Sequence, residues 1–233
     1  VIFPFEENWY KERGIVAKFV GHPIFDEWTP TSKKDLCNIL KLNPNKPILT
    51  LFPGSRKQEL NQHLPLFIKV AEKLRNKNPQ IQFIMGLVRE LNPNYSLIPD
   101  WIQIEKKFPK KSLECADVAL VASGSSTLEA AVFGTPMIII YKMAILSWWL
   151  SKLLVKSDYA GMVNIIAGKK IMPEYLQNKA STEAITNEAF EIIHSYERQT
   201  MMKSELLSVQ KKLHGEGASQ RAAKHILSLT QSK

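Results

Sequence analysis

Four small residues stand at the end of an apolar run in the middle of the chain. They are Ser123, Gly124, Ser125 and Ser126. The run 118–122 before them predicts a strand, and the apolar spacing from Leu128 onward predicts a helix. At such a turn, free backbone N–H groups and the helix dipole attract an anion. Glu129, one turn into the helix, could then accept hydrogen bonds from both hydroxyl groups of a ribose, so the segment predicts a nucleotide site. The alternative is a plain helix cap, with Glu129 as a solvated acid that the helix dipole favours.

A second turn of this kind follows an earlier strand-like run, 48–52. It consists of Pro53, Gly54, Ser55 and Arg56. Pro53 and Gly54 shape a tight turn, and Ser55 can cap the helix that follows. An arginine at the mouth of the turn can bind a diphosphate through two hydrogen bonds and neutralise charge on a leaving group. The alternative is an ordinary strand-to-helix turn with a surface arginine. The functional interpretation is favoured because both turns are expected at one edge of the same sheet.

The histidines and acidic residues do not have the spacing of metal ligands. The chain has no Asp-x-Asp, and its five histidines show no ligand spacing with each other or with a cysteine. We therefore expect no metal site and no cofactor. Stabilisation of a leaving group would come from Arg56, helix N-termini and polar side chains.

Asn164 is a polar residue in the apolar centre of the segment 156–173. If it is buried, its side chain needs hydrogen-bonding partners. It could orient a sugar hydroxyl or a phosphate, and the alternative is a structural asparagine.

Two adjacent tryptophans, Trp148 and Trp149, belong to the segment 144–156, which has a broad apolar face with lysines at its margin. Tryptophan beside lysine suits a membrane interface or a groove for acyl chains. A core helix packed against the sheet is at least as good an interpretation.

The elements that must position these residues alternate along the chain. Strand-like runs lie at 48–52, 81–87, 101–105, 118–121 and 136–141, with helical patterns at 64–77, 112–116 and 126–133. This alternation, with runs that are apolar on both faces, predicts an α/β fold with a parallel sheet and flanking helices. In such sheets ligands bind beyond the carboxyl ends of the strands, where both turns are expected.

The two ends of the chain are expected to be separate from this sheet. Residues 1–30 predict a first strand, a helix near 6–13 and a second strand at 16–20. From residue 182 onward the pattern is helical, ending in a helix at 218–230. We expect three parts, namely 1–30, a nucleotide-binding domain at 31–181 and C-terminal helices at 182–233. The chain begins without Met inside an apolar run, so we expect it to be part of a longer protein.

The composition favours acidic partners. The net charge of +9 suits phosphate esters or an anionic membrane surface, and the lysine pairs are scattered without a nucleic-acid-binding motif, so no nucleic acid is expected. Two cysteines are too few for a disulfide framework and suit a reducing cytoplasm. No apolar run reaches the roughly 20 residues that span a bilayer.

Taken in order, these motifs resemble those of the lipid-A-disaccharide synthase family, over nearly the whole chain from Ile2 to about Ala223. Each motif is weak alone, but their order is specific. The matching residues are Phe3-Pro4-Phe5-Glu6 with Tyr10, Phe19-Val20-Gly21-His22-Pro23, Pro53-Gly54-Ser55-Arg56, Ala122-Ser123-Gly124 with Thr127-Leu128-Glu129-Ala130, Pro136-Met137, Tyr141-Lys142, Asn164-Ile165-Ile166-Ala167-Gly168 and Pro173-Glu174.

The resemblance implies a fold and a reaction. The fold is the C-terminal half of a GT-B fold, with residues 1–30 as a remnant of the N-terminal domain and linker and a Rossmann-like donor domain at 31–181. The reaction transfers a diacylglucosaminyl unit from its UDP donor to the 6-hydroxyl of diacylglucosamine 1-phosphate, with inversion, on the cytoplasmic face of the bacterial inner membrane. Peripheral membrane contact and a homodimer are further expectations.

The resemblance also implies roles for single residues. Arg56 would stabilise the donor diphosphate, Asn164 would be the polar residue of a catalytic loop, and UDP would be held by Gly54, Ser55, Ser123, Gly124, Ser125, Ser126 and Glu129. An inverting displacement needs a general base. In this family that base is expected in the N-terminal domain, which this chain almost entirely lacks.

Two other readings stay open. The first is another GT-B enzyme acting on UDP-N-acetylglucosamine, either a peptidoglycan transferase or a 2-epimerase. The second is a nucleotide-sugar-binding fragment without catalytic activity.

Overall fold

The computed structural model describes residues 1–142, 159–213 and 215–231. Its centre is a parallel sheet of six strands in the order β3-β2-β1-β4-β5-β6. The strands are β1 (Ile48–Phe52), β2 (Gln82–Gly86), β3 (Ile102–Glu105), β4 (Val118–Ala122), β5 (Met137–Tyr141) and β6 (Glu174–Leu176). The chain first adds strands on one side of β1 and then returns to add β4, β5 and β6 on the other. The predicted parallel sheet is confirmed, and β6 is a strand that the sequence patterns did not indicate.

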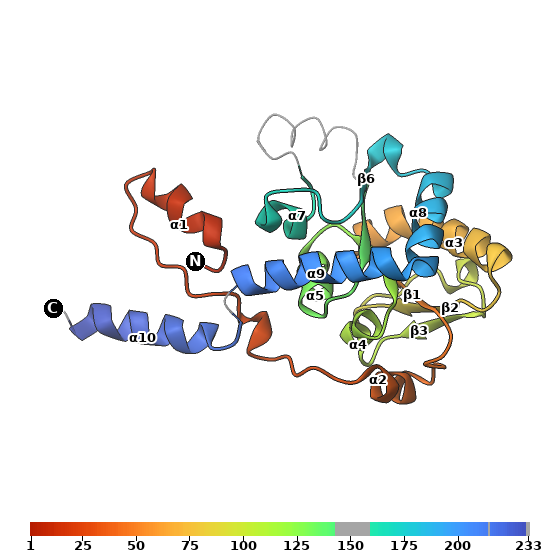
Figure 1. Cartoon of the computed structure of the whole chain (residues 1–233), viewed down its shortest axis with the longest axis horizontal. Coiled ribbons are helices and arrows are strands. Elements are labelled where there is room, and N and C mark those ends of the chain that lie inside the picture. The colour runs from red at the N-terminus through yellow and green to blue at the C-terminus, as the bar shows by residue number, and fades with distance from the viewer. Residues whose placement is uncertain (143–158, 214, 232–233) are drawn as a thin grey trace.

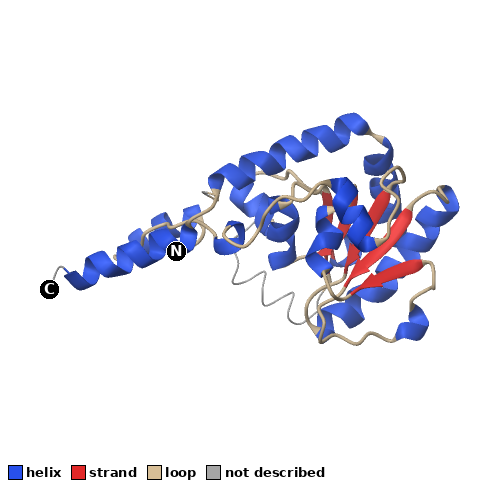
Figure 2. Cartoon of the chain, turned by 90° about the horizontal axis from the view of Figure 1, so that it is seen from below, coloured by secondary structure: helices blue, strands red, loops and turns tan. Residues whose placement is uncertain are grey.

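Helices cover both faces of this sheet (Figure 2). All five residues of β1 and all five of β4 are buried, which explains why these runs are apolar without alternation. The helix α3 packs against α8, and α5 packs against α7 and α9. The helices of the body are α2 (Lys33–Leu40), α3 (Lys57–Lys77), α4 (Pro109–Glu114), α5 (Ser125–Val132), α7 (Met162–Ala167), α8 (Thr182–His194) and α9 (Tyr196–Lys212), with 3-10 turns η2 (Tyr95–Leu97) and η3 (Gln177–Lys179).

The helix α3 begins earlier than the sequence pattern predicted. It starts at Lys57, not near residue 64, because the Glu59 carboxylate reaches back to accept hydrogen bonds from the backbone N–H groups of Ser55 and Arg56, just before the first turn. The helix then continues through Pro65, which lies well inside it. The early start places the N-terminus of α3 directly after the Pro53–Arg56 turn.

The two ends of the chain lie outside the sheet. The helices α1 (Pro4–Lys11) and α10 (Ala218–Gln231) project from the same side of the body (Figure 1). The Asp26 carboxylate, just after the 3-10 turn η1 (Pro23–Phe25), accepts hydrogen bonds from the backbone N–H groups of Gly217, Ala218 and Ser219 and so caps α10. A hydrogen bond with the side chain of Ser219, first of all, and those with the backbone of Ser219, Gly217 and Ala218 lower the pKa of Asp26 to about 2.

The predicted strands at the start of the chain and at 16–20 are wrong. Within the described residues neither stretch belongs to a strand, and Val20 N–H donates to Val1 O instead of to a sheet. An apolar run needs a neighbouring strand to complete its backbone hydrogen bonds, and none lies beside it here.

Candidate functional site

The two predicted turns leave the sheet side by side. The strands β1 and β4 are hydrogen-bonded neighbours and run parallel, with Phe52 in register with Val121. The Pro53–Arg56 turn follows β1 and the Ser123–Ser126 turn follows β4, so both stand at the carboxyl edge where the strand order reverses. In open α/β sheets this switch point is the position at which ligands bind.

The Pro53–Arg56 turn is held by a carboxylate from its own helix. Glu59 Oε2 accepts hydrogen bonds from Ser55 N at 3.0 Å and from Arg56 N at 3.3 Å. Gly54 has φ +126°, and a Cβ atom at that position would lie 2.6 Å from Glu59 Cβ, so a side chain there would push the carboxylate away. Backbone N–H groups that could receive a phosphate oxygen are therefore present, and Glu59 occupies them.

Arg56 is the exposed cation of this turn. Its side chain is 83% exposed, and its nearest acidic neighbour is Glu59, at 3.5 Å between Nη1 and Oε1. The guanidinium is therefore accessible to an anion that arrives at the sheet edge, which would compete with Glu59 for it.

In the Ser123–Ser126 turn, two residues face solvent and two face the protein. Gly124 and Ser125 are exposed, whereas the side chain of Ser126 is buried. Ser123 Oγ donates to Ala160 O at 2.8 Å, so this hydroxyl ties the end of β4 to the segment before α7. Within the described residues, no side chain caps the N-terminus of α5, where Gly124 occupies the N-cap position with φ +156°. The open end of α5 thus leaves backbone donors at the sheet edge.

Glu129 lines a groove of about 540 Å³ beside this turn. Its carboxylate lies 3.1 Å from Lys110 Nζ, and its side chain is 17% exposed. Aromatic residues from distant parts of the chain form another part of the lining. The lining includes His22, Trp28, Lys110, Ser125, Glu129 and Phe133. The charged residues of the lining are two lysines, Lys110 and Lys111, and three acids, Glu27, Glu114 and Glu129. A cavity with aromatic walls and charges of both signs suits a polar ring compound.

Asn164 is buried among its own neighbours in the chain. Its side chain is 0% exposed, Oδ1 accepts from Ile171 N and Met172 N, and Nδ2 donates to Met172 O and to Glu174 Oε1. The amide thus makes all four of its hydrogen bonds within the protein, as expected for a structural asparagine.

Glu174 completes this arrangement. Its carboxylate also accepts hydrogen bonds from Ala160 N and Gly161 N at 3.0 and 2.9 Å. Together, Asn164 and Glu174 fix the course of residues 160–174, which Ser123 joins to β4.

Several residues of this edge were not identified from sequence. Glu59 follows Arg56 by three residues, the spacing of a capping box, so a signal for it was available. Lys110 stood out only as half of a lysine pair, and nothing in the sequence connected it with Glu129. Trp148 and Trp149 lie outside the described residues.

Among the described residues, no three His, Cys, Asp or Glu side chains gather as metal ligands would. None of the described helices combines the length and the hydropathy that spanning a bilayer requires.

Comparison with solved structures shows the fold. The chain superposes on the calicheamicin glycosyltransferase CalG4 with a TM-score of 0.56 at 18% identity, over 90% of this chain and 47% of that one. It superposes on sucrose-phosphate synthase from Thermosynechococcus elongatus with a TM-score of 0.59 at 15% identity, over 100% and 58%. At these identities the likeness concerns the fold alone, and it confirms the predicted C-terminal half of a GT-B fold.

Comparison of sequences shows the family. A family model described as lipid-A-disaccharide synthetase matches residues 1–229. Relatives named lipid-A-disaccharide synthase from Syntrophus aciditrophicus (strain SB) and Coxiella burnetii (strain CbuG_Q212) are 35% and 34% identical over 98% of this chain. The chain spans 62% of the length of each of these relatives. It belongs to the lipid-A-disaccharide synthase family.

Proposed function

We propose that this chain is the donor-binding half of a lipid-A-disaccharide synthase. The complete enzyme would transfer a diacylglucosaminyl unit from its UDP donor to the 6-hydroxyl of diacylglucosamine 1-phosphate. The acceptor oxygen bonds to the anomeric carbon, the bond from that carbon to the UDP oxygen breaks with inversion, and the hydroxyl proton passes to a general base. The observation that carries the proposal is the adjacency of the Pro53–Arg56 and Ser123–Ser126 turns at the ends of β1 and β4.

The exposed groups of this edge match the parts of UDP. Gly124 and Ser125 open α5, so the backbone N–H groups there can receive diphosphate oxygens. The N–H group of Ser55 could do the same once a phosphate oxygen displaces the Glu59 carboxylate from it. The exposed guanidinium of Arg56 can neutralise the charge that develops on the leaving UDP. Glu129, in the adjacent groove, is placed to accept the ribose hydroxyls.

For Asn164 we propose a positioning role within the catalytic loop. To touch a ligand, its amide would have to leave four hydrogen bonds with Ile171, Met172 and Glu174. In its observed position the Asn164 side chain can instead help to hold residues 160–174 against Ser123.

The general base and the acceptor site are expected from the N-terminal half of the GT-B fold. A homodimer and peripheral contact with the anionic inner membrane, through Trp148 and Trp149, are further parts of the proposal. They are supported by the net charge of +9 and by the apolar pattern of the sequence.

Two measurements test this function. Calorimetric titration of the chain with UDP should give saturable binding. The protein made from its complete native gene should transfer only from an acylated UDP donor. Transfer or epimerisation with water-soluble UDP-N-acetylglucosamine alone would favour the alternative GT-B enzymes, and UDP binding without any turnover would favour a nucleotide-sugar-binding protein.

A further inference from the structure

A buried histidine connects the end of β1 with the end of β5. His63 lies on α3, two turns beyond Arg56, and its side chain is 1% exposed. Its Nδ1 lies 3.0 Å from Pro53 O, and its Nε2 lies 3.1 Å from Lys142 N. Pro53 opens the Pro53–Arg56 turn, and Lys142 directly follows β5.

These two contacts determine which ring nitrogen carries the proton. The backbone N–H of Lys142 can only donate, so His63 Nε2 must accept and has no hydrogen. The carbonyl of Pro53 can only accept, so Nδ1 must carry the hydrogen. The ring is therefore neutral and in the Nδ1–H tautomer, because a charged ring would turn Nε2 towards Lys142 as a second donor.

The histidine joins strands that the sheet itself leaves unconnected. The strand β4 lies between β1 and β5 and pairs with both, so no backbone hydrogen bond links β1 to β5. His63 makes that link at the carboxyl edge, one turn of α3 beyond Glu59. The Pro53–Arg56 turn is thus held from two sides, by Glu59 at its N–H groups and by His63 at the carbonyl of Pro53.

We propose that His63 is a positioning residue, which holds the Pro53–Arg56 turn in the orientation that brings Arg56 to the ligand. It touches no substrate and acts through Pro53. Its effect on turnover rests on the proposed function, whereas its effect on the turn does not.

The surroundings of the ring, taken together, favour its neutral form. Burial, first of all, lowers the pKa of His63, and the positive charge of Lys142 acts in the same direction. The hydrogen bonds to the backbone of Pro53 and Glu59 and the charge of the Glu59 carboxylate oppose this. The ring of Phe67 lies 6.0 Å away and adds an apolar neighbour.

The first experiment needs no variant. Long-range proton–nitrogen correlation spectra of the chain, labelled with ¹⁵N-histidine and assigned with His63→Asn, should show His63 protonated at Nδ1 and unprotonated at Nε2 near neutral pH. The opposite tautomer, or a charged ring, would overturn the proposal.

The second experiment measures the consequence for the turn and for catalysis. His63→Leu removes both hydrogen bonds at a similar side-chain volume, whereas His63→Asn retains a donor near the position of Nδ1. In the enzyme from the complete native gene we expect His63→Leu to lower kcat about 10- to 100-fold, the size expected when a catalytic group is misplaced. His63→Asn should recover part of that loss, and KM should change less than kcat in both variants. Unchanged kcat in a folded His63→Leu enzyme, or a change confined to KM, would contradict the proposal.

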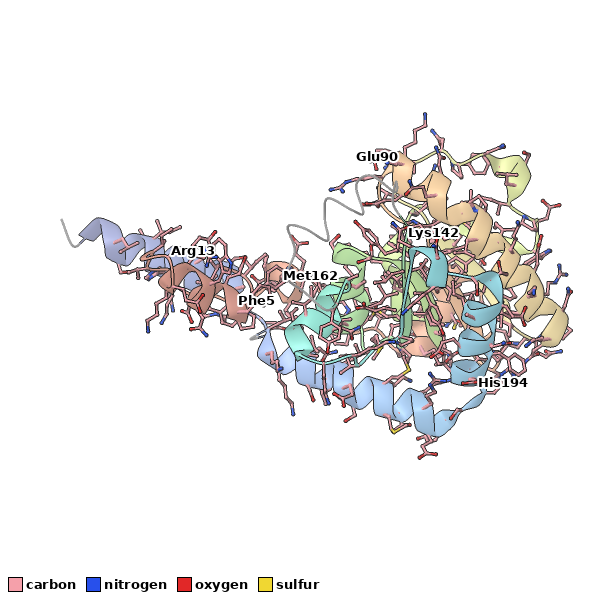
Figure 3. All side chains as sticks on the ribbon, turned by 90° about the horizontal axis from the view of Figure 1, so that it is seen from above. Phe5, Arg13, Glu90, Lys142, Met162 and His194 are labelled. Atoms are coloured by element: carbon pink, nitrogen blue, oxygen red, sulfur yellow. The ribbon has the colours of Figure 1, made fainter. Side chains whose placement is uncertain are left out.

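The matched control is His194, on α8. Its ring nitrogens also have partners, Phe190 O at 2.8 Å and Asn78 Nδ2 at 2.9 Å, but it is exposed and lies apart from Lys142 (Figure 3). His194→Leu should leave kcat unchanged.

If the unaltered enzyme shows no transfer, the proposed function fails. The tautomer of His63 and the backbone amide signal of Arg56 in His63→Leu still decide whether His63 positions the turn. That signal should shift and broaden, and an unchanged signal would count against the proposal.

Discussion

Glu129 on α5 forms an ion pair with Lys110 in the first turn of α4, with 3.1 Å between carboxylate oxygen and ammonium nitrogen. The pair joins two helices that follow different strands, β4 and β3, and it lies in the lining of the groove next to Ser125. The ion pair therefore holds the carboxylate in place before any ligand arrives. In the proposed donor site, the ribose would meet a preformed acceptor.

Glu129→Gln should weaken UDP binding by about 1–3 kcal/mol, because the charge-assisted hydrogen bonds to the ribose become neutral ones. The stability of the fold should change little, because Lys110 is 59% exposed and such ion pairs contribute less than about 1 kcal/mol. Calorimetry with UDP and thermal unfolding test the two parts. Glu197→Gln, at an exposed first-turn acid of α9, is the matched control. Unaltered UDP affinity in Glu129→Gln would remove Glu129 from the ribose site.

Arg56→Ala should cost roughly 2–4 kcal/mol of transition-state stabilisation in the complete enzyme, because the charge on the leaving diphosphate loses its guanidinium partner. Arg56→Lys should recover only part of this, since an ammonium group cannot make the bidentate contact. Steady-state kinetics on both variants measure the effect, with Lys57→Ala, the adjacent exposed cation, as the control. Turnover of Arg56→Ala near that of the unaltered enzyme would exclude the role.

Glu59→Ala should have two effects of opposite sign. Loss of the cap on α3 should lower the free energy of unfolding by about 1 kcal/mol. The same change frees Ser55 N and Arg56 N and removes a negative charge, so UDP should bind more tightly if these N–H groups receive its diphosphate. Chemical denaturation and UDP titration measure the two. Weaker UDP binding by a folded Glu59→Ala chain would show that the diphosphate lies elsewhere.

Asn164→Ala should lower the free energy of unfolding by about 2–4 kcal/mol, since it leaves buried partners at Ile171, Met172 and Glu174 unsatisfied. Asn178→Ala, at an exposed asparagine, should have almost no effect. Urea unfolding compares the two. A folded Asn164→Ala enzyme of normal stability that has lost turnover would instead indicate direct contact with the substrate.

The stability of the chain should decrease as the pH falls below about 6.5, in part through His63. Burial lowers the pKa of this histidine from 6.5 in the folded state. The unfolded chain therefore takes up a proton that the folded chain does not, so the contribution is complete above pH 6.5 and is lost progressively at lower pH. Between about pH 7.5 and about pH 5.5, the free energy of unfolding measured in urea should decrease less for His63→Leu than for the unaltered chain. Burial also lowers the pKa of His22, but this histidine is present in both proteins and contributes equally to the two decreases. Equal decreases in the two proteins would contradict the assignment.

The sequence by itself determined the alternation of strands and helices, because a strand buried on both faces must be apolar throughout, as β1 and β4 are. It also identified the two turns, since Pro, Gly and Ser mark the places where the chain changes direction. It misplaced the start of α3, because that start depends on the Glu59 cap. It also predicted a strand at 16–20, because an apolar run forms a strand only beside a neighbouring strand, and the described fold has none there.

Only the tertiary structure decided which residues meet. Local pattern carries no information on strand order, so the sequence predicted a shared edge for the two turns but not that β1 and β4 are neighbours. The same holds for the contact of Lys110 with Glu129 and for the link from His63 to Lys142, 79 residues away in the chain. The type of a side chain determines which hydrogen bonds and ion pairs it can form. Its actual partner depends on how the helices pack on the sheet.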